Sequence, residues 1–178
     1  MNNKYNFKPF SKNVIFFDTE FSSNDPYTGE ILSIGMVKMS GEELYLELEY
    51  DGPVSDWVKE NLLHTLNKEK VKREKAVEVI KEFLGKDKPY LVTFVNDFDV
   101  VYLHKLLKTK VFVNLPFNWI PIDFASILFG NGINPEKYMQ DKRDNFLKEI
   151  GVDISKYSHH NALDDAKLLR EVYLKMIL

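Results

Sequence analysis

The sequence predicts an α/β fold in which a mixed β-sheet, with three antiparallel strands followed by parallel strands, is flanked by helices. The continuous apolar segment from Val14 to Phe17 is typical of a strand buried on both faces. Two strand-like segments follow it in hairpin order, and from Tyr90 onward strand and helix patterns alternate. The chain has 178 residues, of which 44% are hydrophobic and 29% charged, as expected of one soluble globular domain.

The N-terminal strands are predicted from apolar patterns and turn residues. The hairpin joins residues 31–39 and 42–50 through Ser40-Gly41, a favourable tight turn. Apolar side chains then occupy every second position up to Tyr50, which predicts a strand with one solvated face. Residues 1–13 are polar and basic and lack the apolar core of a secretory signal. We expect residues 1–13 to form a flexible lead-in and residues 14–178 to form a single domain.

Helical periodicity begins after residue 53. Ser55 is a favourable N-cap for a first helix, and Gly85 is a favourable end for a second. After a strand at 90–95, Asp97 is placed to cap a third helix. The first helix carries Val58, Leu62 and Leu66, and the second carries Ala76, Ile80, Phe83 and Leu84. The remaining expected elements are a strand at 118–122, a helix at 124–129, a helix from Asn134-Pro135 to about Gly151, and a last helix at 161–176.

Composition excludes several classes of protein. The chain has no cysteine, which excludes a disulfide scaffold, a thiol nucleophile and any zinc site that needs cysteine, and fits a cytoplasmic location. No apolar run approaches 18 residues, so we expect no membrane span. The net charge is -3, whereas a protein that holds long nucleic acid by charge alone is usually basic. Either the protein does not bind nucleic acid, or it binds a short stretch through metal ions held by its own acids.

The first candidate acids are Asp18 and Glu20, at the end of the most apolar segment of the chain. Side chains at i and i+2 of a strand point to the same face, so both carboxylates leave this strand on one side. The alternative is a strand that simply runs out into solvent. The second candidate is Asp99, which heads the face of a helix that carries Tyr102 and Leu103. An acid in a first helical turn also interacts favourably with the helix dipole, which is the alternative reading of Asp99.

The last helix supplies the third group of candidates. Asp165 falls on the stripe of Ala162 and Leu169, which predicts that it faces the core. An acid in that position must be paired, hydrogen-bonded or metal-bound, and a buried polar pair is the alternative to a metal site. His160 precedes this helix and is placed to reach a pocket rim. The neighbours His159 and Asp164 leave the register open by one residue.

The ordered set Asp-x-Glu, Asp and His-x-x-x-x-Asp resembles the DEDDh branch of the 3′–5′ exonuclease superfamily, which has a ribonuclease H-like fold. The segments that carry the resemblance are FFDTEF, NDFDVVYL and HNALDDA, and it covers residues 14 to 176. The sequence is most similar to small bacterial 3′–5′ exoribonuclease-like proteins, and then to ribonuclease T and oligoribonuclease. The tyrosine branch of the superfamily has Tyr where this chain has Asn161, whereas His160 matches the histidine branch.

The resemblance implies roles for individual residues. Asp18, Glu20, Asp99 and Asp165 are the expected ligands of two divalent cations, Mg²⁺ or Mn²⁺, which prefer oxygen donors. His160 is the expected general base, since imidazole titrates near neutral pH. Substrate contacts are expected from the backbone of Thr19 and from the side chains of Phe21 and Leu32 against terminal bases, with ordinary core packing as the alternative for Phe21 and Leu32.

The function implied by the resemblance is removal of nucleoside 5′-monophosphates from the 3′ end of single-stranded nucleic acid. RNA is the expected substrate, and a DNA-directed 3′–5′ exonuclease is the alternative, because nothing in the sequence reports recognition of a 2′-hydroxyl. A non-catalytic nucleic-acid-binding module on the same fold is an alternative of another class. Similar proteins form homodimers, so we expect a homodimer.

Overall fold

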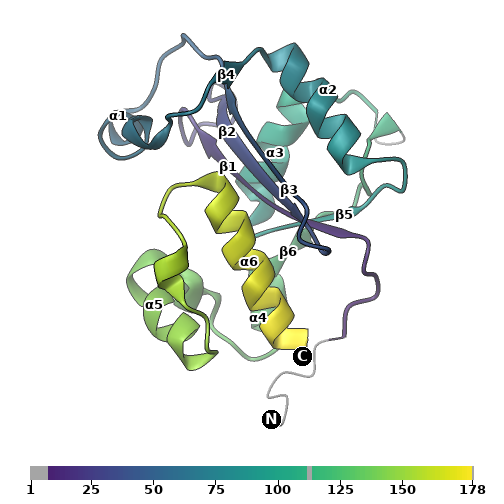
Figure 1. Ribbon diagram of the computed structural model, residues 1–178, viewed down its shortest axis with the longest axis vertical. Coiled ribbons are helices and arrows are strands. Elements are labelled where there is room, and N and C mark those ends of the chain that lie inside the picture. Colours follow the sequence, from purple (N-terminus) through teal and green to yellow (C-terminus); the bar gives the residue numbers. More distant parts are fainter. Residues whose placement is uncertain (1–7, 112–113, 178) are drawn as a thin grey trace.

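Figure 1 shows the computed structural model of the chain, which describes residues 8–111 and 114–177. Within these residues a six-stranded sheet has the order β4-β3-β2-β1-β5-β6. The strands are β1 (Val14–Phe21), β2 (Ile31–Lys38), β3 (Glu43–Leu48), β4 (Lys70–Val71), β5 (Tyr90–Thr93) and β6 (Ile122–Asp123). The strands β1, β2 and β3 are antiparallel, whereas β5 and β6 continue the sheet in parallel beside β1. The predicted mixed α/β fold is confirmed.

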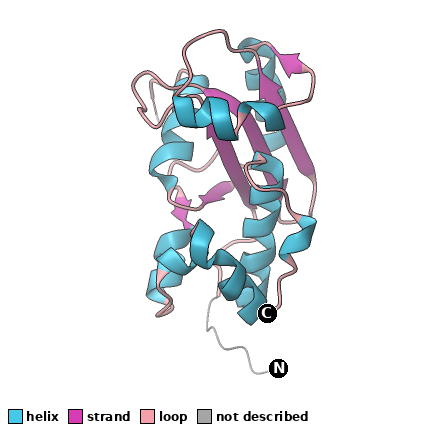
Figure 2. Ribbon diagram, turned by 90° about the vertical axis from the view of Figure 1, so that its left-hand side faces the viewer, coloured by secondary structure: helices cyan, strands magenta, loops and turns pink. Residues whose placement is uncertain are grey.

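Helices cover both faces of this sheet (Figures 1 and 2). The α-helices are α1 (Asp56–Asn61), α2 (Arg73–Leu84), α3 (Asn96–Leu106), α4 (Phe124–Gly130), α5 (Gln140–Glu149) and α6 (Ala162–Ile177). Short 3₁₀ helices are η1 (Leu63–Thr65), η3 (Pro135–Tyr138) and η4 (Ile154–Lys156). Ser55 caps α1 and α2 ends before Gly85, as predicted. Among the helices described, none has the length and apolarity needed to cross a membrane.

Alternate residues of β1 build the two halves of the core. Phe17 packs in the cluster that contains residues of α2 and α3, whereas Phe16 packs in the cluster that contains residues of α4, α5 and α6. Both phenylalanine side chains are fully buried. The prediction that this strand is covered on both faces is therefore confirmed, and it follows that Asp18 and Glu20 emerge on the α6 face with Phe16.

The helix α6 lies against the sheet at Gly35 in β2. A Cβ atom on Gly35 would lie 2.3 Å from the backbone of Ala162 and Leu163, so no larger residue fits without moving the helix. Gly35 is paired with Asp18 across β1 and β2. The first turn of α6 therefore lies beside the strand position of Asp18, which is what brings the two acidic segments together.

Two predicted elements differ from the structure in the central part of the chain. The strand predicted at 118–122 is wrong, because Asn118 accepts a 3.0 Å hydrogen bond from the Ile120 N–H and turns the chain before β6 begins. The helix predicted from Asn134 is interrupted at Met139, whose extended backbone separates η3 from α5. Tyr138 causes this break, since its buried ring packs against Phe94 and Phe124 and draws the chain inward.

Two further predictions, on the cap of α3 and on one face of β3, also differ from the structure. Asp97 does not cap α3, since the N-cap is Val95 in the left-handed conformation, with φ 58° and ψ 75°. One face of β3 was expected to be solvated, and Glu43 on that face is exposed, but Glu47 is 1% exposed. Its Oε1 atom accepts hydrogen bonds from the Asn67 and Lys68 N–H groups and from the Tyr45 hydroxyl, whereas its Oε2 atom is buried without a partner among the described residues.

Candidate active site

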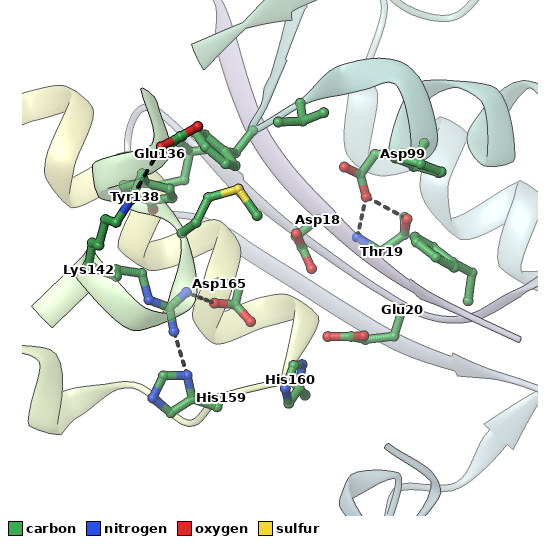
Figure 3. Close-up of a pocket in the computed structure, with 17 residues that line it drawn as sticks. Asp18, Thr19, Glu20, Asp99, Glu136, Tyr138, Lys142, His159, His160 and Asp165 are labelled. Atoms are coloured by element: carbon green, nitrogen blue, oxygen red, sulfur yellow. Dashed lines mark hydrogen bonds and ion pairs between the residues drawn. The ribbon is translucent and has the colours of Figure 1, made fainter. Parts of the chain in front are cut away.

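A cavity of about 840 Å³ lies where the end of β1 meets the first turns of α3 and α6, and η3 and α5 form its opposite wall (Figure 3). The predicted site residues that line it are Asp18, Thr19, Glu20, Phe21, Asp99, His160 and Asp165. Residues far apart in the sequence therefore meet in one hollow, as the sequence predicts. Leu32 does not line this cavity.

The carboxylates of Asp18, Glu20 and Asp165 form the centre of the site. One oxygen from each of these side chains lies within 4.8 Å of the others. Asp18 and Glu20 reach this point from one face of β1, and Asp165 reaches it from the first turn of α6. Its neighbour Asp164 instead accepts a 3.0 Å hydrogen bond from the Ser158 N–H. Asp165, as predicted, is thus the member of the doublet that joins the cluster.

Asp99 occupies the start of α3 and is held by two threonines. Its Oδ1 accepts the Thr19 N–H at 2.9 Å and the Thr19 hydroxyl at 2.6 Å, and its Oδ2 accepts the Thr93 hydroxyl at 2.7 Å. Asp99 is 5% exposed, whereas Asp97 points to solvent. Asp99 is not one of the three acids grouped within 4.8 Å, but its charge acts directly on Asp18. The fold therefore places Asp99, and not the neighbouring Asp97, beside the cluster.

Burial and the repulsion between neighbouring carboxylates raise the pKa values of the acids in the cluster. Burial raises the pKa of Asp18 well above its usual range, and the charges of Asp99, Asp165 and Glu20 raise it further. Burial, followed by the charges of Asp165 and Asp99, raises the pKa of Glu20 to about 8. Burial also raises the pKa of Asp99 to about 6, although its threonine hydrogen bonds oppose this increase.

The donor set fits hard divalent cations. The clustered groups are carboxylates, and oxygen ligands are those that Mg²⁺ and Mn²⁺ prefer. Their mutual repulsion is the effect that a bound cation would relieve, since an opposite charge favours the ionised form. Asp18, Glu20 and Asp165 therefore have the chemistry and spacing to hold a metal ion, with Asp99 adjacent.

His160 and His159 both line the cavity but make different contacts. The His160 ring meets the edge of Trp57 with ring centroids 5.1 Å apart, and its carbonyl accepts the Thr65 hydroxyl at 3.2 Å. Figure 3 shows His160 beside Glu20 and Asp165, whereas His159 lies against Arg143. Burial lowers the pKa of His160, so its ring is neutral at neutral pH. A neutral imidazole can accept a proton, and His160 lines the same cavity as the carboxylates.

Arg143 is the residue of this site that the sequence analysis missed. It lies on α5, donates from Nη1 to Asp165 Oδ1 at 3.1 Å, and contacts His159 Nδ1 with Nη2 at 2.5 Å. Its side chain is 12% exposed. No local pattern distinguishes Arg143 from the other basic residues of its helix, because its partners are brought to it only by the tertiary fold.

The three expected substrate contacts have different surroundings. The Thr19 N–H lies in the cavity but donates to Asp99. Phe21 lines the cavity and stacks on Phe98 with centroids 5.9 Å apart. Leu32 is buried in a small cluster under α1, where it packs as an ordinary core residue. The structure thus brings Thr19 and Phe21 to the site but not Leu32.

Comparison of the sequence with known proteins gives a family match and one curated relative. The chain matches the RNase_T family model, described as an exonuclease, over residues 15–173. It is 24% identical over 169 residues to a DNA polymerase III PolC-type protein of Thermotoga maritima. This match covers 92% of the chain and 12% of that protein, so the chain spans only a small part of this relative.

Solved structures with a similar fold include exonuclease I. The match to one exonuclease I has a TM-score of 0.65 at 12% identity and covers 91% of this chain and 40% of the exonuclease I chain. Exonuclease I of Methylocaldum szegediense has a TM-score of 0.60 at 14% identity, with coverages of 92% and 40%. A chain in the structure of the yeast NOT1 MIF4G domain co-crystallised with CAF1 has a TM-score of 0.58 at 10% identity, with coverages of 92% and 79%. Because the family match spans almost all of the chain and the fold agrees with it, this chain belongs to the RNase_T exonuclease family of the DEDDh superfamily, with a ribonuclease H-like fold.

Proposed function

We propose that this protein is a metal-dependent 3′–5′ exonuclease that removes nucleoside 5′-monophosphates from the 3′ end of single-stranded nucleic acid. The observation that carries the proposal is the grouping of Asp18, Glu20 and Asp165 within 4.8 Å in one cavity with Asp99 and His160. A non-catalytic module of the same fold would tolerate loss of these groups, whereas this chain retains all five.

Two divalent cations, Mg²⁺ or Mn²⁺, would be held by Asp18, Glu20, Asp99 and Asp165. Such cations supply stabilisation of the negative charge that develops on the attacking and leaving oxygens in phosphodiester hydrolysis. The carboxylates contribute by keeping their oxygens ordered in the cavity. Asp99 is the most restrained of them, because Thr19 and Thr93 donate hydrogen bonds to both of its oxygens.

His160 is the proposed general base for the attacking water. Its ring is neutral at neutral pH because burial lowers its pKa, so a ring nitrogen can accept a proton. The contacts with Trp57 and Thr65 restrict the orientation of the ring and backbone. The positive charge formed on the ring would be stabilised by the nearby carboxylate of Asp165.

The substrate is proposed to enter with an unpaired 3′ end. Phe21 and Phe98 form a stacked aromatic wall, and Phe98 is 37% exposed, so a terminal base has a π-face on which to stack. The choice of RNA rests on the resemblance to small exoribonucleases. DNA is the second candidate, because the PolC-type relative is named as a DNA polymerase. We also propose a homodimer from the resemblance, a cytoplasmic location from the absence of cysteine, and a single domain formed by residues 14–178; of the proposed lead-in, residues 1–7 lie outside the described residues.

The proposal is tested with 5′-labelled single strands of matched RNA and DNA sequence. With Mn²⁺ or Mg²⁺ the wild-type protein should give a ladder that shortens stepwise from the 3′ end, and EDTA should stop it. Asp18→Ala should abolish shortening, whereas Glu82→Gln on the exposed face of α2 should shorten strands at the wild-type rate. Internal cleavage, or equal activity of Asp18→Ala, would contradict the proposal. Faster shortening of DNA than of RNA would favour the second candidate.

A further inference from the structure

Arg143 links the helix α6, which carries Asp165, to the loop before it, which carries His159 and His160. Its Nη1 donates to Asp165 Oδ1 in α6, and its Nη2 contacts His159 Nδ1 in the loop before α6. A guanidinium has no acceptor, so His159 accepts with Nδ1 and carries its ring proton on Nε2. One side chain on α5 therefore holds the first turn of α6 and the loop of His160 at the same time.

The environment of Arg143 restricts it to this arrangement. Its side chain is 12% exposed, and its Nε is buried with no hydrogen-bond partner among the residues that the structure describes. A side chain enclosed in this way has few alternative rotamers, so its two Nη atoms keep their directions. Asp165 Oδ1 accepts from Arg143 Nη1, and Figure 3 shows the other oxygen of Asp165 on the side of Glu20 and His160. Arg143 thus occupies one carboxylate oxygen and leaves the other on the side of the cluster.

The loop that Arg143 holds is conformationally strained. His160 has a φ of 56°, in the left-handed region that non-glycine residues seldom adopt. Such a conformation persists only where surrounding contacts determine it. The contacts of this loop include Trp57 on the ring of His160, Thr65 on its carbonyl, and Arg143 on the adjacent His159. The contact from Arg143 is the one that also reaches a carboxylate of the cluster.

We propose that Arg143 is a positioning residue, which fixes the loop of His160 over the carboxylate cluster by binding His159 and Asp165 at once. The catalytic part of this inference rests on the proposed function, with His160 as its general base. Arginine is required because its planar fork presents donors to two partners, whereas the ammonium group of a lysine is a single point. Arg143→Lys should therefore retain one contact only, and Arg143→Leu should lose both while filling a similar space.

Hydrogen–deuterium exchange of the metal-free protein tests the structural half of the inference. Arg143→Leu should speed exchange in peptides covering residues 157–161 by about tenfold, with α2 unchanged, because a local opening would become more populated. His159→Ala removes the contact of Arg143 with the loop but keeps its contact with Asp165, and it should give the same increase in exchange. This second variant still tests the inference if Arg143→Leu does not fold. Lys148→Leu, an exposed change on the same helix, is the matched control and should have no effect. Unchanged exchange in His159→Ala would overturn the inference.

A double-mutant cycle tests whether Arg143 acts through His160. Arg143→Leu should lower kcat for a single-stranded oligonucleotide by about 10- to 100-fold with KM changed less than about threefold. In a His160→Ala background the same substitution should lower kcat less than about twofold, because its target is gone. Arg143→Lys should recover only part of the loss. Multiplicative losses in the double variant would overturn a role through His160. If the wild type has no nuclease activity the proposed function fails, whereas the exchange experiment still decides the contact.

Discussion

Glu20→Gln should stabilise the metal-free protein at alkaline pH, although it removes a proposed metal ligand. Burial and the charges of Asp165 and Asp99 raise the pKa of Glu20 from 4.5 to about 8. The folded chain thus holds this proton more tightly than the unfolded chain does. Its contribution to stability is complete below pH 4.5 and is lost as the pH rises through about 8. At about 1.4 kcal/mol per pKa unit, the loss at pH 8 is at most about 4 kcal/mol.

A glutamine cannot ionise, so the variant avoids this loss. Thermal unfolding in EDTA should give a higher Tm for Glu20→Gln than for wild type at pH 8, by about 2–4 °C for each kcal/mol recovered. At pH 4.5 or below, where Glu20 is protonated in the wild type, the difference should disappear. Glu82→Gln, on the exposed face of α2, is the matched control and should leave Tm unchanged at both pH values. Equal or lower Tm for Glu20→Gln at pH 8 would refute the argument that the cluster opposes folding without a metal.

Three further predictions concern the metal, the base and the packing of α6. Mn²⁺ at about 100 times its Kd should stabilise the wild type by about 2.7 kcal/mol, read as a rise in Tm, and an equal rise in Asp18→Asn would contradict a site at Asp18. His160→Ala should lower kcat by about 10²–10⁴-fold and leave Mn²⁺ binding measured by calorimetry unchanged, whereas weaker binding would make His160 a ligand. Gly35→Ala should lower the free energy of unfolding by about 1–3 kcal/mol in urea titrations, because its Cβ meets the Ala162 backbone; an unchanged midpoint would contradict that contact.

Local sequence patterns predicted the type and the buried faces of those elements that are determined by the residues within the element. The apolar run through Phe16 and Phe17 predicted a strand buried on both faces, and the stripe of Ala162 and Leu169 predicted the inner face of α6. The break at Met139 was not predictable in this way, since it depends on where the Tyr138 ring finds its partners. The N-cap at Val95 was missed for a related reason, because a β-branched residue has no intrinsic preference for a left-handed backbone.

In the candidate site, too, features of single elements were predictable from the sequence, whereas contacts between distant elements were not. The spacing of Asp18 and Glu20 on a strand, and the place of Asp165 on the core face of a helix, are local properties and predicted the face on which each acid lies; their meeting in one cluster was expected from the family resemblance. The role of Arg143 depends on α5 packing against the loop before α6, and no spacing in the sequence reports that contact.

Acids from β1, α3 and α6 are proposed to hold two divalent cations for hydrolysis at a 3′ end. Anomalous diffraction from crystals grown with Mn²⁺ and a nucleoside 5′-monophosphate would locate these cations. We predict two peaks about 3.5–4 Å apart, bounded by Asp18, Glu20, Asp99 and Asp165, with the phosphate beside them. Mn²⁺ bound only elsewhere on the protein, or no peak beside Asp18, would contradict the claim.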